Sequence, residues 1–395
     1  MRSTRLQWLM LTLAFLTSLT MHLLLFSYSQ LKESISLEMQ LTYAEAGFIF
    51  SISFLALVIL RIPWGIAIDR LGVRVGAGLA LTLLGVFGLL RGFAINYETL
   101  LVFQLFLGVG LAAVMPCLPK LVAAWFPSEK AGLATGVSIS GYAIGDIIAL
   151  IVTPYLLMVL GSWRNVFCAY GVWTLILTGV WWTLAREPSQ DYGTQLSSKV
   201  YHDSALPKNF VGLLKMKQLW LLTGLYLCAG ACYDTILLWF TPLCLPLGFL
   251  VASLAVGALS DKVGLRKPFI LGLGLVSGPV IYAAGTLPVP AAWFFAFIVG
   301  LCTIGVLTLV LTIPVELPQV NMSVASAVGL ISSVGNLGSL FMPTIVGQIR
   351  DLTGSFVWSV LILAILGELM LILGLPLTET GRKRRRAGLA SVHGG

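Results

Sequence analysis

Hydrophobic residues along this chain form long, nearly uninterrupted runs, and short polar stretches separate them. A run of about 20 apolar residues crosses the hydrocarbon core of a bilayer as an α-helix. The pattern therefore predicts a membrane protein with twelve spanning helices. The predicted spans are residues 8–29, 43–68, 76–96, 97–124, 131–156, 164–186, 218–243, 246–260, 268–287, 290–313, 322–349 and 355–378.

This spacing predicts an all-α polytopic protein built from two six-helix halves. The halves are residues 1–186 and 218–378, a polar cytoplasmic linker covers 187–217, and a basic cytoplasmic tail covers 379–395. The eighth span holds only about 15 apolar residues, or ~22 Å of helix, against a hydrocarbon core of ~30 Å. We therefore predict a 12-helix (6+6) bundle with a shortened eighth helix.

A polar segment recurs at half the length of the chain, each time directly after an apolar run. Glycine permits a sharp turn between spans, and an aspartate can accept hydrogen bonds from a facing helix N-terminus. Internal repeats of this kind are typical of secondary transporters. The repeated positions, offset by 192 residues, are Gly65, Asp69, Arg70, Gly72 and Arg74, then Gly257, Asp261, Lys262, Gly264 and Arg266.

Composition and charge support the same class of protein. The chain is 58% hydrophobic and 10% charged, whereas a soluble domain is about 25% charged. With a cytoplasmic N-terminus, 19 of the 24 Lys and Arg residues fall on the inside, as the positive-inside rule requires. We expect both termini in the cytoplasm. We interpret the net charge of +8 as a signal that sets the orientation in the membrane rather than as a nucleic-acid-binding site.

Motifs of other function classes are absent from the sequence. It contains no Walker loop, HExxH or GxSxG segment, so we predict neither an enzyme nor a cofactor. Cys228 and Cys232 share a helix face, but no second Cys/His pair stands near them to complete a metal site. The first apolar run is too long for the core of a signal peptide and is predicted to be the first transmembrane helix.

Few ionisable side chains lie inside the predicted spans, where a charge costs about 2.5–3.5 kcal/mol or more. Arg61 lies eight residues, or about 12 Å of helix rise, before Asp69. Its planar guanidinium can clamp a carboxylate or an inorganic anion. The alternative is an arginine that a buried carboxylate holds between helices.

Other polar and aromatic residues of the spans are candidates for the same chemistry. Asp146 and Asp234 can pair with Arg61 or carry a proton, and His22 titrates near neutral pH. Using an offset of 212 residues, taken from Trp8 and Trp220, His22 and Asp234 are expected at equivalent positions of the two halves. We predict solute contacts from Arg61, Asp234 and Trp239, and proton coupling by Asp146 and His22. Helix packing is the alternative role for each.

The repeated loops resemble the signature loop of the major facilitator superfamily. The chain is similar to members of this superfamily along nearly its whole length. Gly65–Arg74 resembles the loop between its second and third helices, and Gly257–Lys267 resembles the second-half copy. The resemblance implies a transporter in which the ten repeated residues form gating loops that hold the cytoplasmic side closed while the site faces outward.

One segment is more specific. Leu60–Gly65 resembles the second helix of the nitrate/nitrite porter and cyanate permease groups, and in the nitrate porters an arginine at this point contacts the anion. The symmetry-related arginine of the eighth helix is Ser253 here, and the fourth-helix arginine of proton-coupled members is Gln104. Gly145-Asp146 stands where drug antiporters carry a Gly-Pro signature.

Together these features predict a secondary active permease of the inner (plasma) membrane. It would be a monomer in the lipid bilayer that moves a small, anionic solute by alternating access, as a proton symporter. One alternative is proton-coupled efflux of a cationic or amphipathic compound through Asp146 and Asp234. Another is a non-transporting membrane sensor or assembly factor on the same fold.

Overall fold

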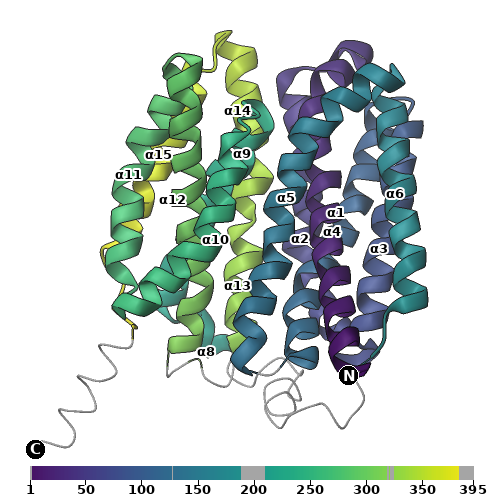
Figure 1. The fold of residues 1–395 in the computed structure, drawn as a ribbon. Coiled ribbons are helices and arrows are strands. Elements are labelled where there is room, and N and C mark those ends of the chain that lie inside the picture. The colour runs from purple at the N-terminus through teal and green to yellow at the C-terminus, as the bar shows by residue number, and fades with distance from the viewer. Residues whose placement is uncertain (1, 127, 188–209, 318–319, 321–323, 382–395) are drawn as a thin grey trace, which may run out of the picture. The chain divides into compact units, whose positions relative to one another are not determined.

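The computed structural model describes residues 2–126, 128–187, 210–317, 320 and 324–381, and within these ranges all regular structure is helical (Figure 1). Among the described residues, twelve helical spans are long and apolar enough to cross a membrane, which confirms the predicted count. The helices are α1 (Arg2–Met39), α2 (Tyr43–Leu71), α3 (Val73–Leu90), η1 (Arg91–Phe93), α4 (Tyr97–Trp125), α5 (Ser128–Leu160), α6 (Trp163–Leu184), α8 (Phe210–Leu214), α9 (Lys217–Trp239), α10 (Cys244–Val263), α11 (Lys267–Thr286), α12 (Val289–Glu316), α13 (Val324–Gly335), α14 (Leu337–Thr353) and α15 (Val357–Gly374).

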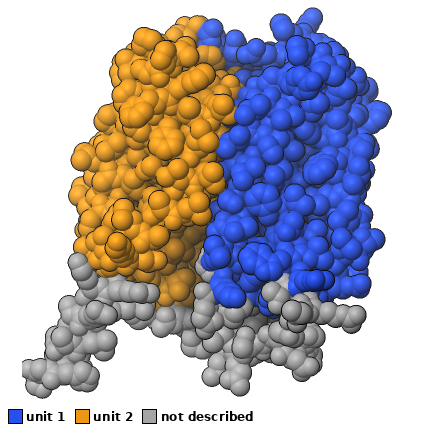
Figure 2. Space-filling model, viewed as in Figure 1, with its two compact units in different colours: residues 1–205, 343–351 blue, residues 206–342, 352–395 orange. Residues whose placement is uncertain are grey.

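The helices form two compact units (Figure 2). Unit 1 comprises residues 1–205 together with 343–351, and unit 2 comprises 206–342 and 352–395. Most of the predicted linker, 188–209, and nearly all of the predicted tail, 382–395, lie outside the described residues. The predicted domain boundaries therefore stay predictions.

The two units repeat the same pattern of helix pairs. In unit 1, α1 packs on α5, α2 on α4, and α3 on both α4 and α6. In unit 2, α9 packs on α13, α10 on α12, and α11 on both α12 and α15. The sequence repeat thus extends from the two loops to the packing of all six helices in each unit.

Local sequence explains where several helices begin and end. A reciprocal capping box between Thr42 and Glu45 starts α2, and one between Asn96 and Thr99 starts α4. Gly72 ends α2 with a positive φ of 87°, a conformation that residues with a Cβ rarely adopt. The predicted sharp turn at the first repeated loop is therefore confirmed.

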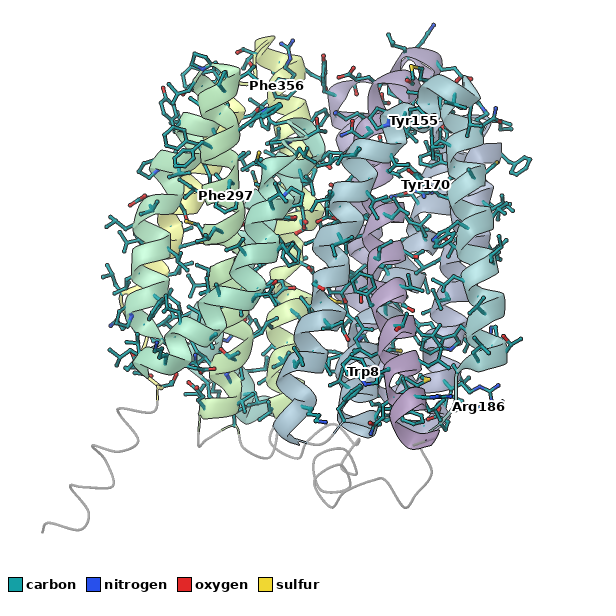
Figure 3. All side chains as sticks on the ribbon, in the orientation of Figure 1. Trp8, Tyr155, Tyr170, Arg186, Phe297 and Phe356 are labelled. Atoms are coloured by element: carbon teal, nitrogen blue, oxygen red, sulfur yellow. The ribbon has the colours of Figure 1, made fainter. Side chains whose placement is uncertain are left out.

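Side chains at the ends of unit 1 fit a protein that crosses a bilayer. Trp8 and Arg186 lie at one end, and Tyr155 lies at the opposite end (Figure 3). Trp8 and Tyr155 are exposed. Aromatic side chains at both ends are typical of the two membrane–water interfaces.

Three spans differ from their predicted form. The eighth, α10, is short with 20 residues against 29 in α2, but at about 30 Å it is longer than the ~22 Å expected. Helix α1 continues ten residues past its predicted end, to Met39, because Glu38 accepts hydrogen bonds from Trp163 and Arg164 at the start of α6. The eleventh span is interrupted at Asn336, between α13 and α14.

Candidate functional site

Arg61 is buried in unit 1 with an incomplete set of partners. It lies ten residues before the end of α2, and its exposed fraction is 7%. Among the described residues, its Nε and Nη2 atoms are buried without a hydrogen-bond partner, and no carboxylate forms a salt bridge with it. The interpretation of Arg61 as a helix-pairing residue held by a buried carboxylate therefore has no support here.

The two unpartnered nitrogens of Arg61 have a useful geometry. In a guanidinium, the N–H bonds of Nε and Nη2 point in the same direction, so together they form a fork that matches the two oxygens of one carboxylate. A buried charge without partners costs several kcal/mol. The site is therefore suited to an anion that supplies the missing acceptors.

A proline follows Arg61 closely in the same helix. Pro63 lies inside α2, where it has no N–H to donate to the carbonyl of Ile59 one turn earlier. Prolines at such positions kink helices and leave a backbone carbonyl open. The segment around Arg61 thus has polar backbone groups as well as a charged side chain at membrane depth.

His22 and Asp146 form a buried pair inside unit 1. The Nδ1 atom of His22 in α1 lies 2.8 Å from the Oδ1 atom of Asp146 in α5. Asp146 is fully buried, and the side chain of His22 is 14% exposed. The ring of Tyr142 lies beside the imidazole, tilted by 30° and with ring centroids 4.5 Å apart. The contact brings an imidazole and a carboxyl group together at the middle of two spans, where an ionisable side chain is by default a functional candidate.

Small residues bring the two helices of this pair together. Gly141 and Gly145 lie one turn apart on α5, and a Cβ on either would overlap backbone atoms of α1 at Phe15 or Leu19. Close approach of two spans through glycines four residues apart is common in membranes. Without it, the short side chain of Asp146 would not reach His22.

Unit 2 lacks a titratable pair at the equivalent place. Gly145 of α5 packs closely against the backbone carbonyl of Leu19 in α1. Gly338 of α14 packs in the same way against the carbonyl of Leu227 in α9, so the same helix contact occurs in both units. This equivalence aligns Asp146 with Ser339 and His22 with Gly230, which do lie against each other. The expected equivalence of His22 and Asp234 is therefore wrong, because Trp8 and Trp220 do not mark the same helix position.

The other two candidates of the solute site lie in α9 of unit 2. Asp234 is half-buried and lies five residues before the end of the helix, nearer that end than predicted. Trp239 is buried, with its ring 5.7 Å from that of Phe356 at the start of α15. Their contact with a solute stays a prediction.

In unit 1, the first repeated loop is tied to neighbouring helices by polar contacts. Asp69 accepts a hydrogen bond of 2.8 Å from Lys120 of α4. The backbone N–H of Arg74 donates to Glu187 at 2.7 Å, directly after α6, and its guanidinium donates to the carbonyl of Trp182. The carboxylate at the N-terminus of α3 is thus Glu187 rather than an aspartate of the repeat.

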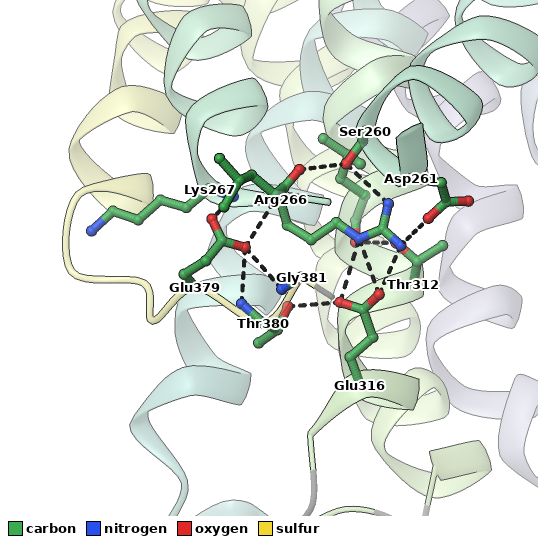
Figure 4. A network of polar contacts seen from close by, with 11 residues as sticks. Ser260, Asp261, Arg266, Lys267, Thr312, Glu316, Glu379, Thr380 and Gly381 are labelled. Carbon is green, nitrogen blue, oxygen red and sulfur yellow. Dashed lines mark hydrogen bonds and ion pairs between the residues drawn. The ribbon is translucent and has the colours of Figure 1, made fainter. Parts of the chain in front are cut away.

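The second loop carries a denser network (Figure 4). The guanidinium of Arg266 donates to Glu316 at 2.7 Å, to Ser260 at 2.9 Å, and to Asp261. Burial alone would lower the pKa of Arg266, but the carboxylates of Glu316 and Asp261 raise it overall. The network joins the ends of α10 and α12 to the start of α11.

Glu379 completes this network from the segment after α15. It accepts backbone hydrogen bonds from Arg266 at 2.7 Å, Lys267 at 3.0 Å, Thr380 at 3.0 Å and Gly381 at 2.9 Å. Partial burial would raise the pKa of the Glu379 carboxyl, but the four N–H donors hold it below its usual range. The role of both loops in gating stays a prediction.

Two features of these sites did not emerge from the sequence interpretation. Glu187 and Glu379 are separated by the same 192 residues as the loops that they cap, so the repeat itself contained that signal. Arg91, near the end of the third predicted span, is fully buried, and its Nη1 donates to Leu24 O at 3.0 Å and Gln104 Oε1 at 3.2 Å. No spacing in the sequence indicates that burial.

Comparisons with known proteins agree with this architecture. The model of the Major Facilitator Superfamily matches residues 10–246. The probable L-galactonate transporter of Escherichia coli K12 is 28% identical over 188 residues, which are 47% of this chain and only 41% of that relative. The probable galactarate/D-glucarate transporter GudP of Bacillus subtilis is 26% identical over 90% of this chain and 88% of its own length. The putative tartrate transporter of Agrobacterium vitis is 22% identical over 87% of this chain and 83% of its own length.

Two solved structures share the fold. The inward-open xylose transporter XylE of E. coli superposes with a TM-score of 0.76 at 15% identity, covering 95% of this chain and 97% of its own. An inward-facing, unoccupied bacterial homolog of the human lysosomal transporter Spinster gives a TM-score of 0.67 at 17% identity, covering 93% and 95%. The finer likeness to nitrate and cyanate carriers stays a prediction.

Proposed function

Because this chain belongs to the major facilitator superfamily and is a transporter rather than an enzyme, we propose that it is a permease for a small organic anion. The observation that carries the proposal is the buried guanidinium of Arg61, whose Nε and Nη2 atoms have no partner among the described residues. A carboxylate of the solute would supply the acceptors that the protein does not.

The class of anion we propose is a polyhydroxylated acid, such as an aldonate or an aldarate. Support comes from three relatives, whose names specify galactonate, galactarate or glucarate, and tartrate. All of these combine carboxylates with hydroxyl groups. The second candidate class is a small inorganic anion such as nitrate or cyanate, favoured by the resemblance of Leu60–Gly65 to those carriers.

We propose proton symport as the energy source, with His22 and Asp146 as the proton carrier. Support comes from the position of the pair: it is largely buried within two membrane spans, and its imidazole and carboxyl groups lie 2.8 Å apart. Alternating access would expose the site in turn to either side of the inner membrane, with both termini in the cytoplasm, as the distribution of Lys and Arg favours.

Uptake by purified protein in proteoliposomes tests the proposal. Under an inwardly directed proton gradient, we expect accumulation of at least one of galactonate, glucarate and tartrate, and none of galactose, which has no carboxylate. Accumulation of nitrate or cyanate alone would transfer the proposal to the second class. Absence of flux for every anion, with folded protein in the membrane, would contradict it and favour a non-transporting role.

A further inference from the structure

A groove lies on unit 2, away from the residues proposed for anion transport. It runs between α11 and α15, which lie side by side (Figure 1). Its volume is about 380 Å³, and its lining residues are Gly278, Pro279, Tyr282, Leu361, Ala364, Ile365 and Glu368. All except Glu368 are glycine, proline, alanine or predominantly apolar side chains.

The walls of the groove include side chains that are exposed within membrane spans. Tyr282 is 47% exposed, Leu361 38% and Ile365 60%, and all three belong to membrane spans. Apolar side chains that remain exposed within a span face lipid or an apolar ligand. The walls of the groove therefore suit an alkyl chain.

A single carboxyl group lies within these apolar walls. Glu368 is six residues, or about 9 Å of helix rise, from the end of α15 at Gly374. Within the described part of the chain it has neither a hydrogen-bond nor a salt-bridge partner, although it is only partly exposed. An acidic side chain at membrane depth is costly and by default indicates a function.

The neighbouring helix leaves room for this carboxyl. A Cβ on Gly278 would lie 2.7 Å from Oε2 of Glu368 and 2.8 Å from the carbonyl oxygen of Ala364. Any larger residue at 278 would therefore displace the Glu368 side chain. Glycine at this position therefore leaves space for the carboxyl group of Glu368 between α11 and α15, inside the groove.

We propose that this groove binds an amphipathic cation, with the positive head against Glu368 and the alkyl chain along Pro279, Tyr282 and Ile365. Charge complementarity selects the head group, because a cation beside Glu368 compensates a carboxylate that is partly removed from water, whereas a neutral head group does not. The apolar walls select the chain. The proposal is independent of the anion site, since every residue it uses lies on α11 and α15.

Saturable binding of radiolabelled dodecyltrimethylammonium to the full-length protein in phosphatidylcholine nanodiscs tests this site. We expect one saturable component above partition into lipid, and Glu368→Gln should weaken it about tenfold, as a loss of ~1.4 kcal/mol would. Dodecanol, which has the same chain and no charge, should not displace the label. Glu98→Gln, a change of an exposed glutamate on α4 in unit 1, is the matched control and should bind as the unmodified protein does.

A second variant separates loss of the site from loss of the fold. Ile365→Ala removes an exposed apolar wall and keeps the carboxyl, so it should weaken binding while thermal unfolding stays unchanged. The proposal is overturned if no saturable component exists, if Glu368→Gln binds as tightly as the unmodified protein, or if dodecanol displaces the cation equally well.

Discussion

The imidazole of His22 lies 2.8 Å from the carboxylate of Asp146, and this contact joins α1 to α5 in the interior of unit 1. The equivalent positions of unit 2 hold Gly230 and Ser339, which cannot titrate in the physiological range. At this level of the bundle the pair of titratable side chains is therefore confined to one of the two repeats. The proposed function assigns the proton to His22–Asp146 and the anion to Arg61, which are separate groups of the same unit.

Substitution of the pair should separate coupling from solute binding. We expect Asp146→Asn and His22→Gln to reduce proton-driven accumulation about tenfold or more, because the amide side chain of Asn or Gln does not bind and release a proton near neutral pH. Counterflow, the exchange of labelled for unlabelled solute without a gradient, should continue at a similar rate. Unchanged proton-driven accumulation in both variants would remove the pair from the coupling mechanism.

The glycine contact behind the pair should be sensitive to added volume. Gly145→Ala places a Cβ against the Leu19 carbonyl and should destabilise the protein by about 1–3 kcal/mol, since helices packed this closely cannot absorb it. Gly179→Ala on α6, where a Cβ meets nothing within 4 Å, is the control and should be neutral. Thermal unfolding in detergent measures both, and equal midpoints for the two variants would contradict the packing argument.

The unpartnered charge of Arg61 should reduce stability when no solute is bound. We expect Arg61→Met to raise the free energy of unfolding by about 1–4 kcal/mol, because replacing a buried ion by an apolar side chain of similar length removes a desolvation cost. The same variant should lose transport. A lower unfolding temperature for Arg61→Met, measured without anions, would mean that the guanidinium has stabilising partners.

Acid should weaken the network around the second loop through Glu379. Its pKa in the folded protein is lowered below the ordinary 4.5, so its contribution to stability is present above that pH. The contribution is lost as the pH falls through the lower, folded-state pKa. We expect the unfolding temperature of the unmodified protein to fall over this range and that of Glu379→Gln to start lower and vary less.

The control for this experiment is Glu98→Gln, a change of an exposed glutamate on α4. It should show the same acid dependence as the unmodified protein. If Glu379→Gln also kept the full dependence, the four backbone hydrogen bonds of Glu379 would not account for the low pKa.

The helices and loops of the fold were predictable because lipid imposes them. A span must be apolar over about 20 residues. The turn after the second span has a positive φ at Gly72, a backbone conformation that glycine adopts readily. The break at Asn336 was not predicted, although Gly335 and Gly338 flank Asn336 and all three residue types weaken a helix. The extension of α1 depends on Glu38 meeting α6, a contact between distant segments.

Sequence identified the ionisable residues of the site but not how they pair. Arg61, Asp146 and His22 were recognisable by their positions within apolar runs. That Asp146 contacts His22 and not Arg61 depends on the register of α1 against α5, which Gly145 sets in three dimensions. The alignment by Trp8 and Trp220 failed because an exposed aromatic at a span end marks the membrane interface rather than a packing position.

The most direct measurement is the affinity of the purified protein for its anion with and without the Arg61 guanidinium. Using whichever acid is accumulated in proteoliposomes, we expect Arg61→Gln to weaken binding about 10- to 100-fold, the effect of losing hydrogen bonds to a charged group worth ~1.5–3 kcal/mol. Arg186→Gln, which removes an exposed arginine at the end of unit 1, should bind as the unmodified protein does. Equal affinity of Arg61→Gln and the unmodified protein would contradict the account.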